Sequence, residues 1–184
     1  MTVALVIGGA RDTWPEVERA FREFSVDRIV AINQAVADYV GYIDAAVSLH
    51  PVKLQGWLDS RSRARATGAF SIGHIVSFKD HDGLIKYPVT DVVPYLWWGM
   101  TKSGSSGLYA VKVAMKLLGA NKIILAGVPM DAGPHYYNGR PWGVPMDFRE
   151  GWEQAMPYIK DTVRSYSGWT KELLGEPTQE WISA

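Results

Sequence analysis

Short continuous runs of apolar residues punctuate this chain, and longer stretches with helical spacing separate them. Four runs end in glycine, proline or a polar residue: Val3–Ile7, Arg28–Asn33, Ala45–His50 and Lys122–Gly127. Continuous apolar runs of this length are typical of strands that are buried on both faces of a parallel sheet. Shorter strands are predicted at Gly73–Phe78 and at Val163–Tyr166.

Helices are predicted between these strands. Thr13 and Glu16 have the spacing of a capping box, with Pro15 at the first helical position, and apolar residues follow every three or four positions. Further helices are expected between the second and third strands, from Leu54 into the basic stretch Arg61–Arg65, from Leu108 to Gly119, from Glu150, and after Pro177. Strands that alternate with helices predict a single α/β domain over residues 1–184, with a mostly parallel sheet. The pattern leaves the strand order within residues 70–100 open.

Composition narrows the class of protein. Lys plus Arg and Asp plus Glu number 19 each, which disfavours a nucleic-acid partner. The chain has no cysteine, so disulfides and zinc–thiolate sites are excluded. The first apolar run lacks a basic leader and meets Gly8 too early for a signal sequence or a membrane span, so we expect a cytoplasmic protein.

The carboxyl ends of parallel strands are where ligands bind in α/β proteins. Here those ends carry Gly8-Gly9-Ala10-Arg11-Asp12, Asn33-Gln34, His50-Pro51 and the loop that starts at Val128. We therefore expect these segments to meet at one rim, beside the turn Ser103–Gly107.

Ser105, Ser106 and Gly107 precede the helix that leads to the fourth long strand. Free backbone N–H groups and the dipole at such a helix start favour an anion such as phosphate, although ordinary helix capping would also explain these residues. Arg11 and Asp12 are candidates for contacts to phosphate and hydroxyl groups. Neither a Gly-x-Gly-x-x-Gly fingerprint nor a Walker motif occurs at the strand–helix turns, which disfavours NAD dehydrogenases and P-loop enzymes.

Residues 128–149 contain four prolines and three glycines and have no periodic pattern. A connection of this length is more often functional than idle, so we expect an active-site loop or lid. Within it, His135 and Asp131 are candidates for general acid or base chemistry. Asp80-His81-Asp82-Gly83 contains metal-ligand residue types, but Gly83 favours an exposed turn.

In their order along the chain these segments resemble the family of bacterial CMP-sialic-acid-dependent sialyltransferases and the related 6-hydroxymethylpterin diphosphokinase-like domains. In the sialyltransferases a first strand leads to Gly-Asn-Gly-Pro-Ser, a second ends in Asn-Gln, a third ends in Asn-Pro, and Thr-Ser-Gly-Val-Tyr starts a helix before a strand ending Ser-Gly-Ile-Asp. The corresponding segments here are Gly8–Asp12, Asn33-Gln34, His50-Pro51, Ser105-Ser106-Gly107-Leu108-Tyr109 and Ala126-Gly127-Val128-Pro129. Pro129 stands in place of the aspartate, and Asp131 follows two residues later.

The resemblance implies a Rossmann-like three-layer domain that binds a nucleotide. It implies that Asn33, Ser106 and Gly107 contact the nucleotide and that the turn Gly8–Asp12 lies close to its phosphate or sugar. The expected function is a nucleotide-dependent transferase, either a glycosyltransferase-like enzyme that uses a nucleotide-activated sugar or a pterin diphosphokinase-like diphosphotransferase. No convincing loop carries a DxD-type metal motif, so we expect a sugar transferase to need no cofactor, and a requirement for Mg²⁺ stays open for a diphosphokinase. A non-catalytic nucleotide-binding module of the same fold is the alternative from another class, and the oligomeric state stays open.

Overall fold

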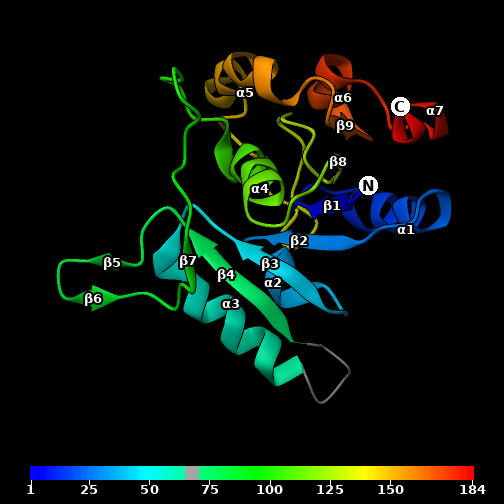
Figure 1. Ribbon diagram of the computed structural model, residues 1–184. Helices are drawn as coiled ribbons and strands as arrows, with labels where there is room; N and C mark the ends of the chain where they lie inside the picture. The colour runs from blue at the N-terminus through cyan, green and yellow to red at the C-terminus, as the bar shows by residue number, and fades with distance from the viewer. Residues whose placement is uncertain (65–70) are drawn as a thin grey trace.

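The computed structural model describes residues 1–64 and 71–184. Its centre is a seven-stranded sheet in the order β7-β4-β3-β2-β1-β8-β9, with every neighbouring pair parallel (Figure 1). The strands of this sheet are β1 (Val3–Ile7), β2 (Arg28–Ile32), β3 (Ile43–Val47), β4 (Ile72–Ser77), β7 (Asp91–Val92), β8 (Lys122–Ala126) and β9 (Val163–Ser165). The prediction of an α/β fold with a parallel sheet is confirmed.

Helices cover both faces of the sheet. They are α1 (Thr13–Glu23), α2 (Ala35–Asp38), α3 (Pro51–Ala64), α4 (Ser105–Lys116), α5 (Met146–Ile159), α6 (Gly168–Leu174) and α7 (Gln179–Ser183). Ala4 and Val6 of β1 pack in one core with α4 and α5, while Val3, Leu5 and Ile7 pack in a second core with α1 and α2. Successive side chains of a buried strand point to opposite faces of the sheet, and this creates the two apolar layers of a Rossmann-like domain.

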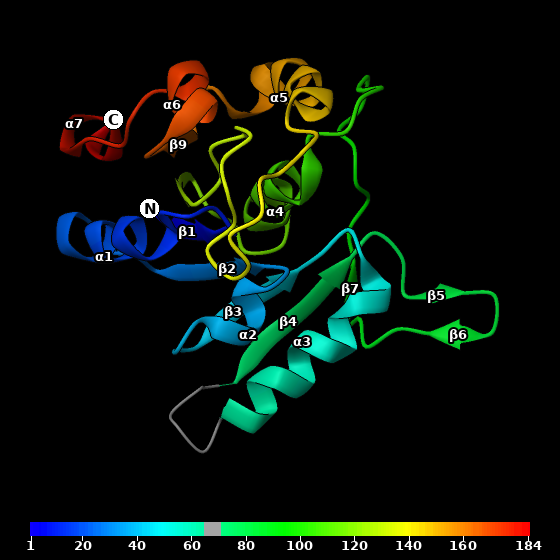
Figure 2. The same ribbon diagram turned by 180° about the vertical axis from the view of Figure 1, so that it is seen from behind.

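The order of the strands reverses at β1. From β1 the chain moves through β2, β3, β4 and β7 to one edge, and then returns through α4 to place β8 and β9 on the other side (Figure 2). A parallel sheet has its ligand crevice at such a reversal, outside the carboxyl ends of the strands. The two strands at the reversal, β1 and β8, end at Ile7 and Ala126 and are followed by Gly8 and Gly127.

One strand boundary and one helix cap differ from the predictions. The third strand is Ile43–Val47, not Ala45–His50, because the Ser48 hydroxyl accepts a hydrogen bond from the His50 N–H and the chain turns into α3. The expected capping box at Thr13 does not form: Asp12 is the N-cap, and the Glu16 carboxylate instead accepts the Gly127 N–H at 2.7 Å.

Some elements were not anticipated. A small antiparallel hairpin, β5 (His81–Asp82) and β6 (Ile85–Lys86), projects from the edge near β7, with Gly83 at a φ of 57° in its turn (Figure 1). The prediction of an exposed turn there is confirmed.

Helix α6 was not predicted, and α5 begins at Met146, before the expected Glu150. Arg65, the last residue of the predicted basic stretch, lies outside the described residues.

Among the helices that the structure describes, none is both long enough and apolar enough to cross a bilayer.

Candidate functional site

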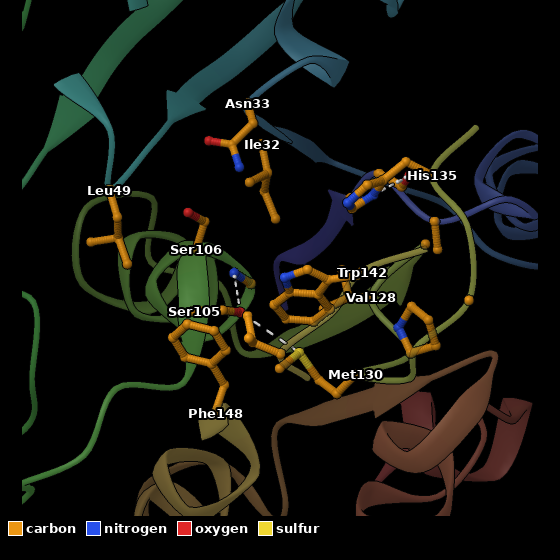
Figure 3. Close-up of a pocket in the computed structure, with 18 of the residues that line it drawn as sticks. Ile32, Asn33, Leu49, Ser105, Ser106, Val128, Met130, His135, Trp142 and Phe148 are labelled. Atoms are coloured by element: carbon orange, nitrogen blue, oxygen red, sulfur yellow. Dashed lines mark hydrogen bonds between the residues drawn. The ribbon is translucent and has the colours of Figure 1, made fainter. Parts of the chain in front are cut away.

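A cavity of about 590 Å³ lies at the carboxyl ends of β1 and β8, against the start of α4. Its wall combines apolar side chains with a small number of polar groups, as is usual for small-molecule sites. The lining residues named in Figure 3 are Ile32, Asn33, Leu49, Ser105, Ser106, Val128, Met130, His135, Trp142 and Phe148. These residues come from strand ends, from the start of α4 and from the long loop, so segments distant in sequence build one cavity.

Most of the predicted site residues line this cavity. They are Gly8, Gly9, Asn33, His50, Ser105, Ser106 and Gly107, together with Asp131 and His135. Arg11, Asp12 and Gln34 do not belong to the lining. Arg11 lies at a second, neighbouring hollow, and the Gln34 amide donates to the Asp38 carboxylate at 3.1 Å. Asp12 occupies the N-cap position of α1 without a side-chain capping bond.

Close packing explains the glycines at the strand ends. A Cβ on Gly8 would lie 2.2 Å from the Gly127 carbonyl oxygen, and one on Gly107 would lie 2.6 Å from Cγ1 of Val128. A Cβ on Gly9 would meet only ordinary contacts at 3.5 Å, from His135 and Tyr137. Gly8 is therefore required by the approach of β1 to β8, whereas Gly9 borders the cavity with space beside it.

Asn33 is held by the hydroxyl group of the buried Ser48. The Ser48 hydroxyl accepts the His50 N–H at 2.8 Å and donates to Asn33 Oδ1 at 2.7 Å. The amide oxygen is thus engaged, and within the part of the chain that the structure describes the Asn33 amide NH₂ has no hydrogen-bond partner, so it is left for a ligand. Figure 3 shows the Asn33 amide and the Ser106 hydroxyl both extending into the cavity, from the end of β2 and the start of α4.

His50 adds a neutral ring to the same rim. Burial lowers the pKa of His50 below its usual value, and the positive charge of Lys53 lowers it further. At neutral pH the imidazole is therefore uncharged and can hydrogen-bond to a ligand without adding charge.

The start of α4 offers fewer free groups than its sequence suggests. The Ser105 N–H donates to Ser103 Oγ and the Gly107 N–H donates to Ser105 Oγ, both at 3.2 Å. Capping thus accounts for Ser103 and Ser105. In the described part of the chain the Ser106 N–H and hydroxyl have no such partner, so Ser106 is the group at this helix start that is available to an anion.

Three cavity residues adopt a left-handed backbone conformation. Asn33, Ser105 and Met130 have φ values of 53°, 69° and 55°, and among residues 1–64 and 71–184 no other non-glycine residue has positive φ. All three line the cavity. Left-handed conformations are unfavourable for side chains other than asparagine and aspartate, and such strain is concentrated at functional sites.

Residues 128–145, together with the start of α5, form one wall of the cavity. Trp142 and Phe148 stack with their ring centroids 5.5 Å apart and provide a flat aromatic surface. Their neighbours in the wall are Val128, Met130 and Val144. These residues were not predicted as site residues, because a loop without periodicity gives no information about which side chains point inwards.

His135 is fixed against the first turn of the fold. Its Nδ1 lies 3.1 Å from the Gly9 carbonyl oxygen, and its residue forms an isolated antiparallel bridge with Ala10. A carbonyl oxygen only accepts, so Nδ1 carries the hydrogen and Nε2 is the unprotonated nitrogen of the neutral ring. His135 is thus held in the tautomer that a general base requires.

Asp131 is engaged in an ion pair. Arg149 Nη2 lies 2.8 Å from Asp131 Oδ1, and the same guanidinium donates twice to the Met130 carbonyl at 3.1 Å. These contacts fix the start of the loop on α5. Asp131 therefore supports the cavity wall, and His135 is the better candidate for a base.

Metal-ligand residue types do not cluster in the described ranges: no group of three or more His, Cys, Asp or Glu residues there could hold a metal ion. Asp131 is the carboxylate that lines the cavity, and Arg149 already occupies one of its oxygens. The site thus provides one carboxylate toward Mg²⁺, so any further ligands would have to come from substrate phosphates and water.

The half-buried carboxylate of Glu16 accepts a hydrogen bond from the Gly127 N–H and so holds α1 against the end of β8. Burial raises the pKa of Glu16 above its usual value, while hydrogen bonds from Ser167 and the Gly127 N–H partly oppose this effect. The folded state thus binds the proton more tightly than the unfolded state. The free-energy cost of ionised Glu16 is absent below its ordinary pKa and develops as the pH rises through the raised pKa.

We predict that Glu16→Gln becomes increasingly stabilising, relative to the native chain, as the pH rises across this window. Glutamine retains an acceptor for the Gly127 N–H but has no charge to bury. Urea unfolding between pH 4 and pH 8 measures the difference. Glu18→Gln, on the exposed side of the same helix, is the matched control. A constant difference between Glu16→Gln and the native chain across this range would contradict the prediction.

The fold and the cavity define a Rossmann-like α/β protein with a ligand-sized site at its topological switch point. Comparison with protein-family models, with curated proteins and with solved structures finds no match for this chain. Function is therefore inferred from the geometry and chemistry of the cavity.

Proposed function

We propose that this protein is a nucleotide-dependent transferase that uses a nucleotide-activated sugar. The observation that carries the proposal is the concentration of strained backbone at one cavity: Asn33, Ser105 and Met130 all line it in left-handed conformations. Such strain costs about 1–3 kcal/mol at Ser105 and at Met130, whereas asparagine tolerates this conformation, and strained residues are concentrated at functional sites. The cavity lies at the switch point of the sheet, where α/β proteins of this type bind nucleotides.

The polar and apolar parts of the cavity suit the two halves of a nucleotide. The Ser106 N–H and hydroxyl at the start of α4 favour a phosphate, because the helix dipole adds to their hydrogen bonds. The Asn33 amide would donate to the ribose or base. The stacked pair Trp142 and Phe148 offers an apolar surface against which a flat ring could pack.

Transfer of a sugar requires help for the leaving group and a base for the acceptor. As the bond between the sugar and the phosphate breaks, negative charge grows on the nucleotide, and donors fixed at Ser106 would stabilise that charge. The acceptor hydroxyl loses its proton as its oxygen bonds to the sugar. His135 Nε2 is the group that we assign to accept this proton.

A non-catalytic nucleotide-binding module is the second candidate. It is favoured by the ion pair of Asp131 with Arg149, which leaves His135 as the sole base that we assign in the cavity. A pterin diphosphokinase-like activity would depend on Mg²⁺, for which Asp131 and the substrate phosphates would have to serve as ligands.

The test is a thermal-shift titration with cytidine, uridine, guanosine and adenosine nucleotides and their sugar conjugates. A ligand at about 100 times its Kd should stabilise the fold by about 2.7 kcal/mol. For a domain of this size that corresponds to a rise in Tm of roughly 5–10 °C. Nucleotide binding at the rim predicts this rise for at least one base; no shift with any of the four would contradict it.

Two variants separate binding from chemistry. Ser106→Leu fills the space in front of the helix start and should abolish the nucleotide shift, measured against that variant's own Tm. His135→Ala should retain the shift and lose sugar transfer, since it removes only the base. Equal loss of binding in both variants would reassign His135 to ligand recognition, and retention of transfer by His135→Ala would exclude it as the base.

A further inference from the structure

A second hollow adjoins the cavity on the other side of His135. It has a volume of about 370 Å³ and is lined by Arg11, Pro134, His135, Tyr136 and Gly139. His135 lines both hollows. Because the imidazole of His135 borders both spaces, it can act on a ligand in either one.

The cation of this hollow is free to bind a ligand. Arg11 is exposed, and its guanidinium makes no hydrogen bond or ion pair with the residues that the structure describes. Several other arginines are engaged: Arg19 contacts Glu23 and Arg149 contacts Asp131, each at 2.8 Å. An unpaired guanidinium presents a planar fork of donors that matches carboxylate and phosphate groups.

The wall of the hollow is fixed by contacts on both sides. Tyr136 donates from its hydroxyl to Asp38 Oδ2 at 2.8 Å, and its ring packs edge-on against Trp14 at 5.2 Å. The Tyr136 N–H donates to the Gly9 carbonyl at 3.2 Å. The Asp38 carboxylate also accepts from Gln34, so its charge is engaged by neutral donors. The segment 134–139 thus has a defined position over the first turn.

We propose that this second hollow binds the acceptor of the transfer reaction, and that the acceptor is a hydroxyl compound with a carboxylate or phosphate group. The proposal rests on the proposed function. Arg11 holds the anionic group, and the hydroxyl faces His135. In the transfer step the acceptor oxygen bonds to the anomeric carbon, the bond from that carbon to the phosphate oxygen breaks, and its electron pair leaves with the nucleotide. The acceptor proton moves to His135 Nε2.

The experiment follows ligand binding by NMR of the ¹⁵N-labelled protein, at the Arg11 Nε–H and at the His135 ring nitrogens. The probes are D-glucuronate, glucose 6-phosphate and neutral glucose, which share a hydroxyl-bearing ring and differ in the anionic group. Arg11→Gln should raise the Kd of the anionic probe about tenfold, since a hydrogen bond to a charged group is lost. Arg22→Gln is the matched control, because Arg22 is exposed at the far end of α1, on the order of 15 Å along the helix axis.

Shifts at Arg11 and His135 with an anionic probe and not with glucose, together with a weaker Kd in Arg11→Gln alone, support the proposal. The probe that binds identifies the group as carboxylate or phosphate. Three results would overturn it: no shift with either anion, equal binding of glucose, or equal loss in Arg11→Gln and Arg22→Gln. A parallel titration with nucleotides, followed at Ser106 and Asn33, tests the proposed function separately. If only the nucleotides fail, the anion site stands and its acceptor role falls with the proposed function.

Discussion

Gly8→Ala should destabilise the protein by about 3 kcal/mol or more, because the added Cβ has no space to occupy. It would lie 2.2 Å from the Gly127 carbonyl oxygen and 2.7 Å from Cγ2 of Val128. A backbone oxygen cannot rotate away as a flexible side chain can, so β1 and β8 would have to separate at the switch point. Urea unfolding and the Tm measure this effect, with an expected fall in Tm of roughly 6–12 °C.

The adjacent Gly9→Ala is the matched control for this prediction. Its Cβ would lie 3.5 Å from His135 Nδ1 and from Tyr137 Cε1, which are ordinary contacts. We expect the free energy of unfolding to change by less than about 1 kcal/mol. Equal stability losses in the two variants would show that the tight approach of Gly8 to Gly127 does not determine the effect.

The core strands could be predicted because the sheet is covered on both faces. Burial of successive residues in β1, β2 and β8 produces continuous apolar runs that sequence alone reveals. Short elements such as α2 and α6 have too few residues for a helical period, and only α2 was anticipated. The capping box failed because Glu16 has a tertiary partner, the Gly127 N–H, which no local pattern contains.

The convergence of site residues was predictable from topology. Parallel strands bring their carboxyl ends to one edge, so Gly8, Asn33 and His50 had to lie near one another once the sheet was known. The direction of each side chain was not predictable. Gln34 turns to Asp38 of α2, and Arg11 lines the second hollow, whose other residues come from the segment 134–139; neither arrangement is visible in the local sequence.

The capping role of the serines also could not be predicted from the sequence. Ser103 and Ser105 resemble phosphate ligands in the sequence, yet each accepts a backbone N–H of the turn itself. A left-handed φ of 69° at Ser105 makes this geometry possible. Sequence could identify the turn as suited to an anion, whereas only the hydrogen bonds single out Ser106 as its free group.

Arg61→Ala should destabilise the protein by about 3–4 kcal/mol, because it removes a buried cation that binds several backbone carbonyls. Arg61 is only 2% exposed. Its guanidinium donates to the carbonyls of Val36 at 3.1 Å and Tyr39 at 2.6 Å, and also to that of Gly41. These carbonyls follow Asn33 through α2, so the arginine holds the segment that leads from the cavity rim to β3.

Arg63→Ala provides the control on the same helix, since Arg63 is exposed and, within residues 1–64 and 71–184, its side chain donates only to Ser60 Oγ, at 3.1 Å. We expect it to change the free energy of unfolding by less than about 0.5 kcal/mol. Arg61→Lys should fall between the two, because one ammonium group cannot reach all the carbonyls that a planar guanidinium spans. If Arg61→Ala were as stable as Arg63→Ala in urea, the carbonyl contacts of Arg61 would contribute little to the fold, and the position of Asn33 would depend on the Ser48 hydroxyl instead.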